Sequence, residues 1–301
     1  MRADNPLTGT LAATPRVLTP LALLAAALAL IVPSGALAAR SDLLLALLVL
    51  ATALGISFAD LRRLRDHAAE VAVLSVAPPV LLGAAAWVLG RPFAPPVRDG
   101  LLAVGLASSE IASVGLVALA GADATIALGA VSGSLVASAL LAPLAAGALA
   151  DASAHADPTR LLARFALVVI LPLIVGVAAR SRWPRMAVAN PEREGIAALT
   201  VAVLIYAALS GTHHAHHLAA ALLASVAFLV VSAALAELWR RRAGAATGVP
   251  GAFAIAMRDF AVAAALATQA FGTAAGAVPG VYGVVMLVAG TIAAGRLAKR
   301  D

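Results

Sequence analysis

Charged residues in this chain are gathered into short clusters that separate long apolar runs, and this pattern limits the possible folds more than any other feature. An apolar run of about 20 residues is long enough for a helix to cross the hydrocarbon core of a bilayer. Hydrophobic residues make up 62% of the 301 residues and charged residues 12%, with a mean hydropathy of +1.00. Soluble globular domains are about 45 to 50% apolar and about 25% charged. The composition therefore argues against a water-soluble enzyme or a disordered chain and indicates an integral membrane protein.

Ten apolar runs are predicted to form transmembrane helices, which makes the chain an all-α polytopic membrane protein. The runs lie near 17–38, 42–57, 68–90, 97–118 and 123–146 in the first half, and near 158–179, 194–211, 216–239, 250–271 and 276–297 in the second. Five helices per half is an odd number, so two similar halves must have opposite orientations in the membrane. Inverted repeats of this kind are typical of secondary transporters. The predicted units are a cytoplasmic tail (1–16), a first five-helix repeat (17–146), a connector (147–157) and a second, inverted five-helix repeat (158–298).

Basic residues outnumber acidic residues 21 to 15, and all but one of them are arginine. Fifteen of the 21 fall in loops on one side of the predicted helices, including the run Arg240, Arg241 and Arg242. Cytoplasmic loops carry an excess of Lys and Arg, so both termini are predicted to be cytoplasmic, and the even number of helices agrees. This distribution is typical of membrane orientation and argues against nucleic-acid binding.

The first apolar run ends in Ala36-Leu37-Ala38, which also fits the small-residue cleavage site of a signal peptide. The segment before the run is long for a signal peptide and carries Asp4 as well as Arg2 and Arg16. These features favour an uncleaved first helix, and cleavage would leave nine helices with the same orientation downstream.

Three charged residues lie inside the apolar runs: Glu110 in the fourth, and Arg258 and Asp259 in the ninth. Glu110 and Asp259 are 149 residues apart, close to half the chain, and both stand among small residues that suit an interrupted helix. A charge at the bilayer centre costs about 2.5 to 3.5 kcal/mol on insertion scales, so such residues are functional candidates. The alternative is a buried ion pair that only joins helix four to helix nine.

The predicted substrate or ion site is built from polar residues of these two helices: Ser108, Ser109, Glu110, Ser113, Arg258, Asp259, Thr268 and Gln269. Interrupted helices leave backbone groups without partners, and transporters use such breaks to bind substrate. Thr268 and Gln269 also suit a simpler role in hydrogen bonds between helices.

Around these residues the sequence resembles the bile acid:sodium symporter family, as a divergent bacterial member of the bile/arsenite/riboflavin transporter superfamily. The similarity extends from about residue 17 to residue 298. It is carried by the following stretches: Leu54-Gly55-Ile56-Ser57, Leu119-Ala120-Gly121-Ala122-Asp123, Val131-Ser132-Gly133-Ser134 with Pro143-Leu144, and Met257-Arg258-Asp259 with Leu266, Phe271 and Pro279-Gly280. The resemblance implies a core with two broken, crossing helices, a flatter panel domain, and alternating access. It also implies uptake of an organic anion, usually with sodium, through the inner membrane of a bacterium.

The sequence departs from the family at the positions that the resemblance assigns to sodium binding. The family's glutamate corresponds to Ala254, its glutamine to Arg258 and its asparagine to Val114, beside a retained Ser113. A guanidinium repels a sodium ion, so we expect sodium coupling to be weakened or lost. A proton carried by Glu110 or Asp259 is the alternative coupling ion.

Arg258 is the best candidate for an anion anchor, because a guanidinium stays charged and holds a carboxylate with two hydrogen bonds. Its simpler role is a salt bridge to Glu110 or Asp259. Both roles are compatible if the substrate competes for the arginine.

Other function classes fit less well. The chain has no cysteine and no His-Glu-x-x-His motif, which argues against thiol chemistry and an intramembrane metalloprotease. A proton-coupled carrier or an exporter of the same fold, a channel and a membrane scaffold remain as alternatives. No cofactor is expected besides Na⁺ or H⁺ as coupling ion, and substrate identity, transport direction and oligomeric state stay open. A weak candidate for a metal-binding site is a histidine cluster, composed of His213, His214, His216 and His217. The same residues also fit a solvent-exposed loop with no metal.

Overall fold

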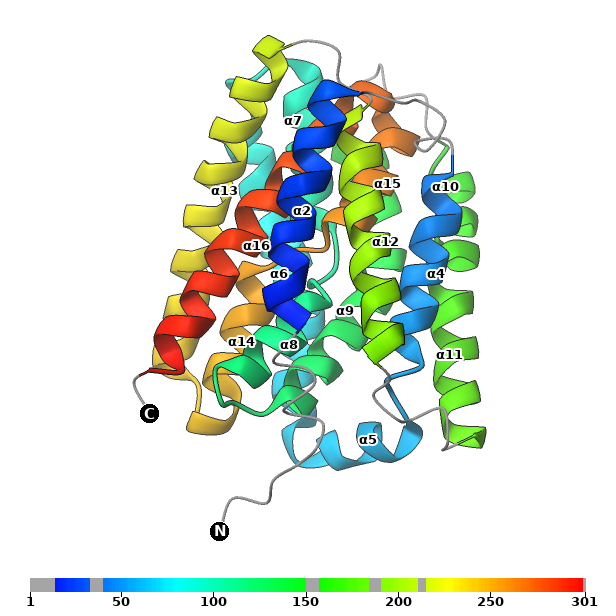
Figure 1. Cartoon of the computed structure of the whole chain (residues 1–301), viewed down its shortest axis with the longest axis vertical. Coiled ribbons are helices and arrows are strands. Elements are labelled where there is room, and N and C mark those ends of the chain that lie inside the picture. The colour runs from blue at the N-terminus through cyan, green and yellow to red at the C-terminus, as the bar shows by residue number, and fades with distance from the viewer. Residues whose placement is uncertain (1–13, 33–39, 150–156, 184–190, 211–214, 300–301) are drawn as a thin grey trace.

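A computed structural model describes residues 14–32, 40–149, 157–183, 191–210 and 215–299. Over these residues the regular secondary structure is helical (Figure 1), and the one strand-like feature is an isolated antiparallel pairing of Ser109 with Arg258. Five helices are long and apolar enough to cross a membrane: Leu64–Gly90, Ala124–Leu149, Pro158–Arg182, Leu218–Arg242 and Thr273–Leu297. The fold therefore agrees with the helical membrane protein expected from the sequence.

Each predicted run overlaps one helix or one interrupted helix. The first half contains α2 (Thr14–Ile31), α4 (Ser41–Ala53), α5 (Phe58–Arg63), η1 (Leu64–His67), α6 (Ala68–Gly90), α7 (Pro95–Leu106), α8 (Ala112–Leu119) and α9 (Ala124–Leu149). The second contains α10 (Pro158–Phe165), η2 (Ala166–Ile170), α11 (Leu171–Arg182), α12 (Pro191–Ser210), α13 (Ala215–Arg242), α14 (Ala245–Ala256), α15 (Phe260–Phe271), η4 (Thr273–Gly276) and α16 (Ala277–Leu297). The helix formed by the second run is shorter than expected from the sequence. Helix α4 ends at Ala53, in a turn where the amide of Gly55 donates to the carbonyl of Thr52.

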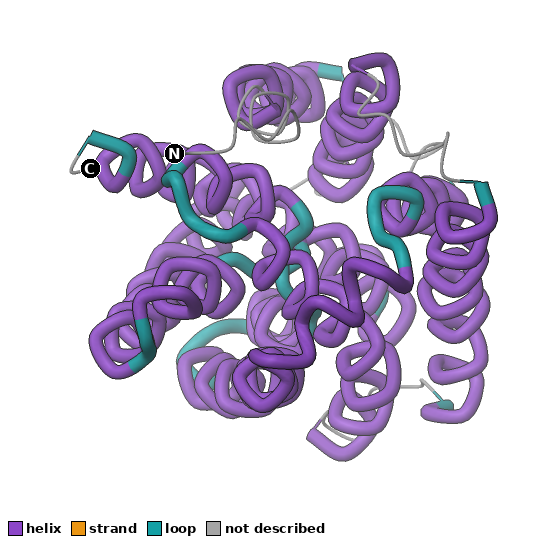
Figure 2. The backbone as a smooth tube through the Cα atoms, turned by 90° about the horizontal axis from the view of Figure 1, so that it is seen from below, coloured by secondary structure: helices purple, strands orange, loops and turns teal. Residues whose placement is uncertain are grey.

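The helices form a row and a larger group behind it. In the row, α2 contacts α12, α12 contacts α4, and α4 contacts α11, so that these helices lie side by side (Figure 1). The larger group contains α6 to α9 and α13 to α16, and most helices of both groups are seen nearly end-on from below (Figure 2). Two threonine hydroxyls, of Thr19 in α2 and Thr291 in α16, meet at 3.0 Å between the row and the group.

The contacts of the first half recur in the second. Helix α6 packs on α7 and on α9, and α13 likewise packs on α14 and on α16. Across the halves, α7 packs on α15 as α14 packs on α8, and α2 packs on α12 as α11 packs on α4. A similar pattern of helix contacts therefore occurs in both halves of the chain.

Helices α7 and α14 both stop inside the bundle, and α8 and α15 continue from them after short extended segments. Ala107 follows α7 with φ −64° and ψ 164°, and Met257 follows α14 with φ −108° and ψ 115°. The segment after α7 contains Ser108 and Ser109, whose side chains compete with helical hydrogen bonds. Close packing holds α7 in place, because a Cβ on Gly105 would lie 2.5 Å from the carbonyl oxygen of Leu82 in α6.

Candidate functional site

The two interrupted helices cross at their breaks and are joined there by two backbone hydrogen bonds. The amide of Glu110 donates to the carbonyl of Met257 at 3.0 Å, and the amide of Asp259 donates to the carbonyl of Ser108 at 2.7 Å. The two donors, Glu110 and Asp259, are 149 residues apart in the sequence, and so are the two acceptors, Ser108 and Met257. The crossing is thus a short antiparallel pairing of two segments that lie 149 residues apart in the chain.

The carbonyl groups left free at the C-terminal end of α7 have identified partners. The carbonyl of Leu106 accepts from the hydroxyl of Ser138 in α9 at 3.0 Å. The next carbonyl, of Ala107, accepts from Nη2 of Arg258. The last four carbonyls of a helix lack intrahelical partners, so the side chain of Arg258 replaces part of the missing helix.

The end of α14 is completed by the same arginine and by three hydroxyl groups. The carbonyl of Ala254 accepts from the hydroxyl of Ser109 at 2.8 Å and from Nη1 of Arg258 at 3.3 Å. The carbonyl of Ala256 accepts from the hydroxyl of Tyr282 at 3.1 Å and from that of Ser232 at 3.3 Å. Arg258 therefore binds the carboxyl-terminal ends of both interrupted helices.

The two acidic residues of the crossing lie at the amino-terminal ends of the helices that follow the breaks. Oδ1 of Asp259 accepts from the amides of Ala261 at 2.9 Å and Val262 at 3.0 Å and caps α15. Oε1 of Glu110 accepts from the amide of Ala112, the first residue of α8, at 3.3 Å. Negative charge is stabilised at helix N-termini and positive charge at C-termini, and the three buried charges follow this rule.

No ion pair within 4.0 Å joins Arg258 to Glu110 or Asp259 among the described residues, although an ion pair was one of the roles expected for this arginine. The guanidinium instead contacts the hydroxyl of Ser109 at 3.3 Å and the two backbone carbonyls. The side chain is fully buried, with 0% of its surface exposed. Arg258, Glu110 and Asp259 thus each contact the end of a helix instead of one another.

Several buried polar atoms of the crossing have no hydrogen-bond partner within the described part of the chain. They are Oγ of Ser108, Oε2 of Glu110, Oγ of Ser113, Nε of Arg258 and Oδ2 of Asp259. Buried polar groups in proteins are nearly always hydrogen-bonded, so each exception requires a reason. A ligand, an ion, a proton or water at the crossing is the common explanation for a cluster of such groups.

Two residues of the candidate site lie elsewhere. Thr268 and Gln269 are nine and ten residues along α15 from Asp259, about 14 Å at 1.5 Å per residue. The Thr268 hydroxyl donates to the carbonyl of Ala264 in its own helix at 2.8 Å. Nε2 of Gln269 donates to Oδ1 of Asp42 in α4 at 2.7 Å. The structure thus places Gln269 in a contact between helices, which was its simpler expected role.

Sequence reasoning missed the hydroxyl groups that support the crossing from neighbouring helices. The hydroxyl of Ser134 in α9 accepts from the amide of Ser109 at 2.8 Å, and that of Tyr282 in α16 accepts from the amide of Arg258 at 3.1 Å. Ser134 belongs to the stretch Val131-Ser132-Gly133-Ser134, which contributed to the family resemblance but not to the predicted site. Tyr282 is fully buried and is one of two tyrosines in the chain. A single phenol within an apolar run was the sequence feature that could have identified it.

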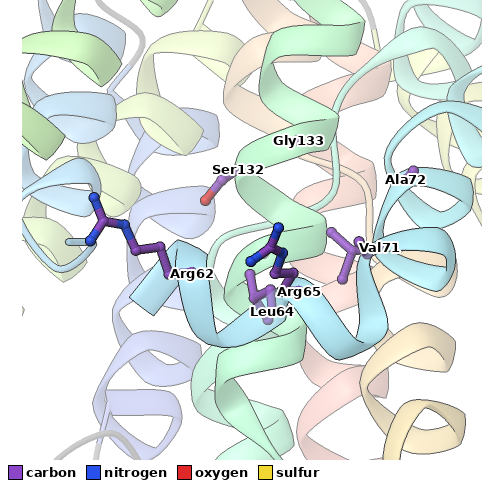
Figure 3. Close-up of a pocket in the computed structure, with 9 residues that line it drawn as sticks. Arg62, Leu64, Arg65, Val71, Ala72, Ser132 and Gly133 are labelled. Atoms are coloured by element: carbon purple, nitrogen blue, oxygen red, sulfur yellow. The ribbon is translucent and has the colours of Figure 1, made fainter. Parts of the chain in front are cut away.

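A separate open cavity of about 650 Å³ lies between η1, the start of α6 and α9 (Figure 3). Its charged lining residues are Arg62 and Arg65, and Ser132 and Gly133 of α9 form its opposite wall. Successive residues of a helix are rotated by about 100°, so Ser134, which contacts the crossing, faces away from Ser132. Helix α9 therefore stands between this cavity and the crossing.

No group of three or more His, Asp or Glu residues that could hold a metal ion occurs among the residues that the structure describes. His213 and His214 lie outside the described residues, and the side chains of His216 and His217, at the start of α13, are not described either. The segment Ala36-Leu37-Ala38 and the connector residues 150–156 also lie outside the described ranges.

Comparison with known sequences agrees with the resemblance seen at the breaks. Among curated proteins, none matches this chain. The sequence pattern of the SBF-like CPA transporter family matches residues 20–288, which include all the helices of both halves except parts of α2 and α16. With its helical fold and interrupted, crossing helices, the chain belongs to the SBF-like CPA transporter family.

Proposed function

We propose that the protein is a secondary active transporter that carries a small organic anion across the cytoplasmic membrane by alternating access. The observation that carries this proposal is the crossing of α7/α8 with α14/α15, where five buried polar atoms have no hydrogen-bond partner among the described residues. Interrupted helices with unsatisfied groups are the usual location of substrate sites in secondary transporters. Ser108, Ser109, Glu110, Ser113, Arg258 and Asp259 form this site, and Thr268 and Gln269 lie outside it.

We propose two inverted repeats, 17–146 and 158–298, joined by a connector, 147–157. In this arrangement α7 with α8, and α14 with α15, each cross the membrane as one interrupted span. The recurrence of helix contacts in the two halves supports the proposal. So does the pair of backbone hydrogen bonds at the crossing, which exchange places under the 149-residue offset.

We propose that both termini are cytoplasmic. The ends of α11, α13 and α16 and the whole of α5 lie at one end of the bundle (Figure 1). These elements carry a basic set, composed of Arg62, Arg63, Arg180, Arg182, Arg240, Arg241, Arg242 and Arg296. An excess of arginine at one end supports a cytoplasmic location for that end.

An anionic substrate is supported by the arginine side chains found in both candidate regions. Nε of Arg258 is buried and has no partner in the described ranges of the chain, which leaves one guanidinium donor for a carboxylate. In the open cavity, Arg62 and Arg65 are the charged lining residues (Figure 3), and a cleft of one sign of charge concentrates ions of the other. Arg258 is the proposed anchor, and the open cavity is the proposed point of contact with the cytoplasm.

Sodium coupling is not part of the proposal, because Ala254 offers no side-chain oxygen and a guanidinium lies beside its carbonyl. The second candidate is proton coupling, and a specific observation favours it. Oε2 of Glu110 and Oδ2 of Asp259 are both buried and lack partners within the part of the chain that the structure describes, so each carboxyl group has an oxygen free to hold a proton.

The proposal is tested by reconstituting the purified protein in liposomes and measuring uptake of a panel of organic anions. Each anion is offered with a sodium gradient, a proton gradient or neither. We expect saturable uptake that a proton gradient stimulates, that sodium does not change, and that Arg258→Ala reduces at least about tenfold, the loss expected for one charge-assisted contact. Arg296→Ala, at the end of α16, is the matched control and keeps wild-type uptake.

The alternatives give different results in the same assay. A non-saturating flux that follows the electrochemical gradient in both directions identifies a channel. Sodium-driven uptake contradicts the inference drawn from Ala254 and Arg258. Absence of uptake, together with absence of thermal stabilisation by every anion, favours a scaffold and rejects the transporter.

A further inference from the structure

The guanidinium of Arg258 lies where two helices direct their negative ends into the interior of the protein. Its Nη atoms contact the carbonyl of Ala107 beyond α7, the carbonyl of Ala254 in α14, and the hydroxyl of Ser109 between them. All three acceptors are neutral oxygens, and all three residues are fully buried. The hydrogen-bond acceptors of the guanidinium are thus backbone and hydroxyl oxygens, the ligand type that hard cations prefer.

Electrostatics requires a positive charge at this position. A helix carries about half a negative elementary charge at its carboxyl end, and two such ends meet at the crossing. The charge cannot be screened by bulk water, because Ser108, Ser109 and Arg258 are each 0% exposed. Arginine remains protonated in proteins, so its charge is permanent there.

We infer that Arg258 is the resident cation of the crossing: a covalently attached guanidinium occupies the oxygen-lined site between the ends of α7 and α14, so that no diffusible cation binds there. The crossing then contains its own full set of counter-charges. Arg258 stabilises the two carboxyl-terminal ends, and Glu110 and Asp259 stabilise the amino-terminal ends of α8 and α15. The inference deepens the proposed transporter and rests on it for its meaning in transport, whereas its test below uses no substrate.

Removal of the Arg258 side chain should leave an empty, oxygen-lined site that can bind cations from solution. Arg258→Ala leaves the carbonyls of Ala107 and Ala254 and the hydroxyl of Ser109 around an empty space of guanidinium size. Methylguanidinium has the lost shape and charge, and Na⁺ has the charge alone. Arg258→Gln is the matched variant, because its amide keeps two hydrogen-bond donors and partly fills the space but carries no charge.

The test is the thermal unfolding midpoint of the purified full-length protein in detergent, at constant ionic strength balanced with choline chloride. The added cations are Na⁺, K⁺, guanidinium and methylguanidinium at millimolar concentrations. For wild type we expect no cation-specific shift. For Arg258→Ala we expect a midpoint lower by on the order of 5 to 10 °C, of which methylguanidinium restores a saturable part.

The controls separate charge from hydrogen bonding. Arg258→Gln should be destabilised and should respond less to methylguanidinium than Arg258→Ala, and Arg296→Ala should behave as wild type. Saturable stabilisation of the wild type by Na⁺ overturns the inference. So does an Arg258→Ala variant that is as stable as wild type and insensitive to all four cations.

A second comparison applies if Arg258→Ala does not give folded protein. Arg258→Lys retains a cation and Arg258→Gln does not, so the inference predicts a midpoint near wild type for the first and well below it for the second. Equal midpoints for these two variants overturn it. A protein that shows the expected cation response but transports no anion leaves the inference intact and removes the proposed function.

Discussion

At the scale of single residues, the buried charges of this protein are explained by the helix ends that they contact. Asp259 caps α15 through two amides, and Glu110 contacts the first amide of α8. Arg258 binds carbonyls at the ends of α7 and α14. Each charge therefore compensates the break in a helix, which explains how a chain with so few charged residues retains three in its interior.

This view predicts a large stability loss on removal of the Asp259 cap. Asp259→Ala deprives the amides of Ala261 and Val262 of their acceptor in a buried environment, and a lost cap costs about 0.5 to 2 kcal/mol even when exposed. Asp259→Asn keeps one acceptor oxygen and should lose less. The measurement is the thermal unfolding midpoint of each variant in detergent.

An exposed cap supplies the matched control. Asp123 accepts from the amide of Thr125 at 2.8 Å at the start of α9, where solvent replaces a lost acceptor. Asp123→Ala should therefore lower the midpoint less than Asp259→Ala does. An equal fall in the unfolding midpoint for the two alanine variants would show that burial at the crossing does not increase the contribution of the cap to stability.

At the scale of elements, the crossing depends on how closely α7 approaches α6. Gly105 makes this approach possible, since its Cβ position lies 2.5 Å from the carbonyl oxygen of Leu82 and 2.6 Å from Cβ of Ala86. The nearest obstacle is backbone, which cannot rotate away as a long side chain can. Helix α7 is thus fixed at the depth where its break meets that of α14.

We predict that Gly105→Ala destabilises the protein by about 1 to 3 kcal/mol, the usual cost of overpacking a tight interface. Gly295→Ala, in α16, is the matched substitution, because outside its own stretch of helix no atom of the described residues lies within 4 Å of its Cβ position. That variant should be unchanged or more stable by up to about 1 kcal/mol, as alanine favours helix over glycine. The measurement is the thermal unfolding midpoint of both variants. A Gly105→Ala variant as stable as wild type would mean that α7 can move away from α6 without loss of stability.

At the scale of the whole molecule, the helices divide into the row of α2, α12, α4 and α11 and the larger group that contains the crossing. Polar side-chain contacts join the row to the group and to α10. One joins Thr19 to Thr291 at 3.0 Å, and another joins Asp42, which also binds Arg164, to Gln269 at 2.7 Å. Alternating access requires such contacts to form and break as one group moves against the other.

A cross-link between the two groups should therefore stop transport. The chain has no cysteine of its own, so a Thr19→Cys, Thr291→Cys double variant contains only the intended pair. The contact of the two hydroxyls places the side chains within reach of a disulfide bond. We expect oxidation to abolish anion uptake in liposomes and reductant to restore it.

The two single-cysteine variants are the controls for this prediction, and both should transport under oxidising and reducing conditions alike. Full uptake by the cross-linked protein would show that α2 and α16 do not move relative to each other during transport. The alternating-access proposal would then need a different division of the helices.

The sequence by itself determined the class of the protein, the positions of its helices and the location of its unusual residues. Hydropathy sums over neighbouring residues, so the apolar runs near 68–90 and 276–297 predicted α6 and α16 closely. The same local signal identified Glu110, Arg258 and Asp259, because a charge inside an apolar run is visible without knowledge of the fold. The small, polar residues around Ser108 likewise indicated an interrupted helix.

Only the tertiary structure decided what each of these residues contacts. It paired Arg258 with backbone carbonyls instead of an acidic side chain, recruited Ser134 and Tyr282 to the crossing, and placed Gln269 against Asp42. A hydrogen bond depends on which atoms lie within about 3 Å, and these partners are separated by up to 227 positions in the chain. Residue type and spacing along a helix fix which side chains need a partner, whereas the packing of helices from distant parts of the chain fixes which partner is available.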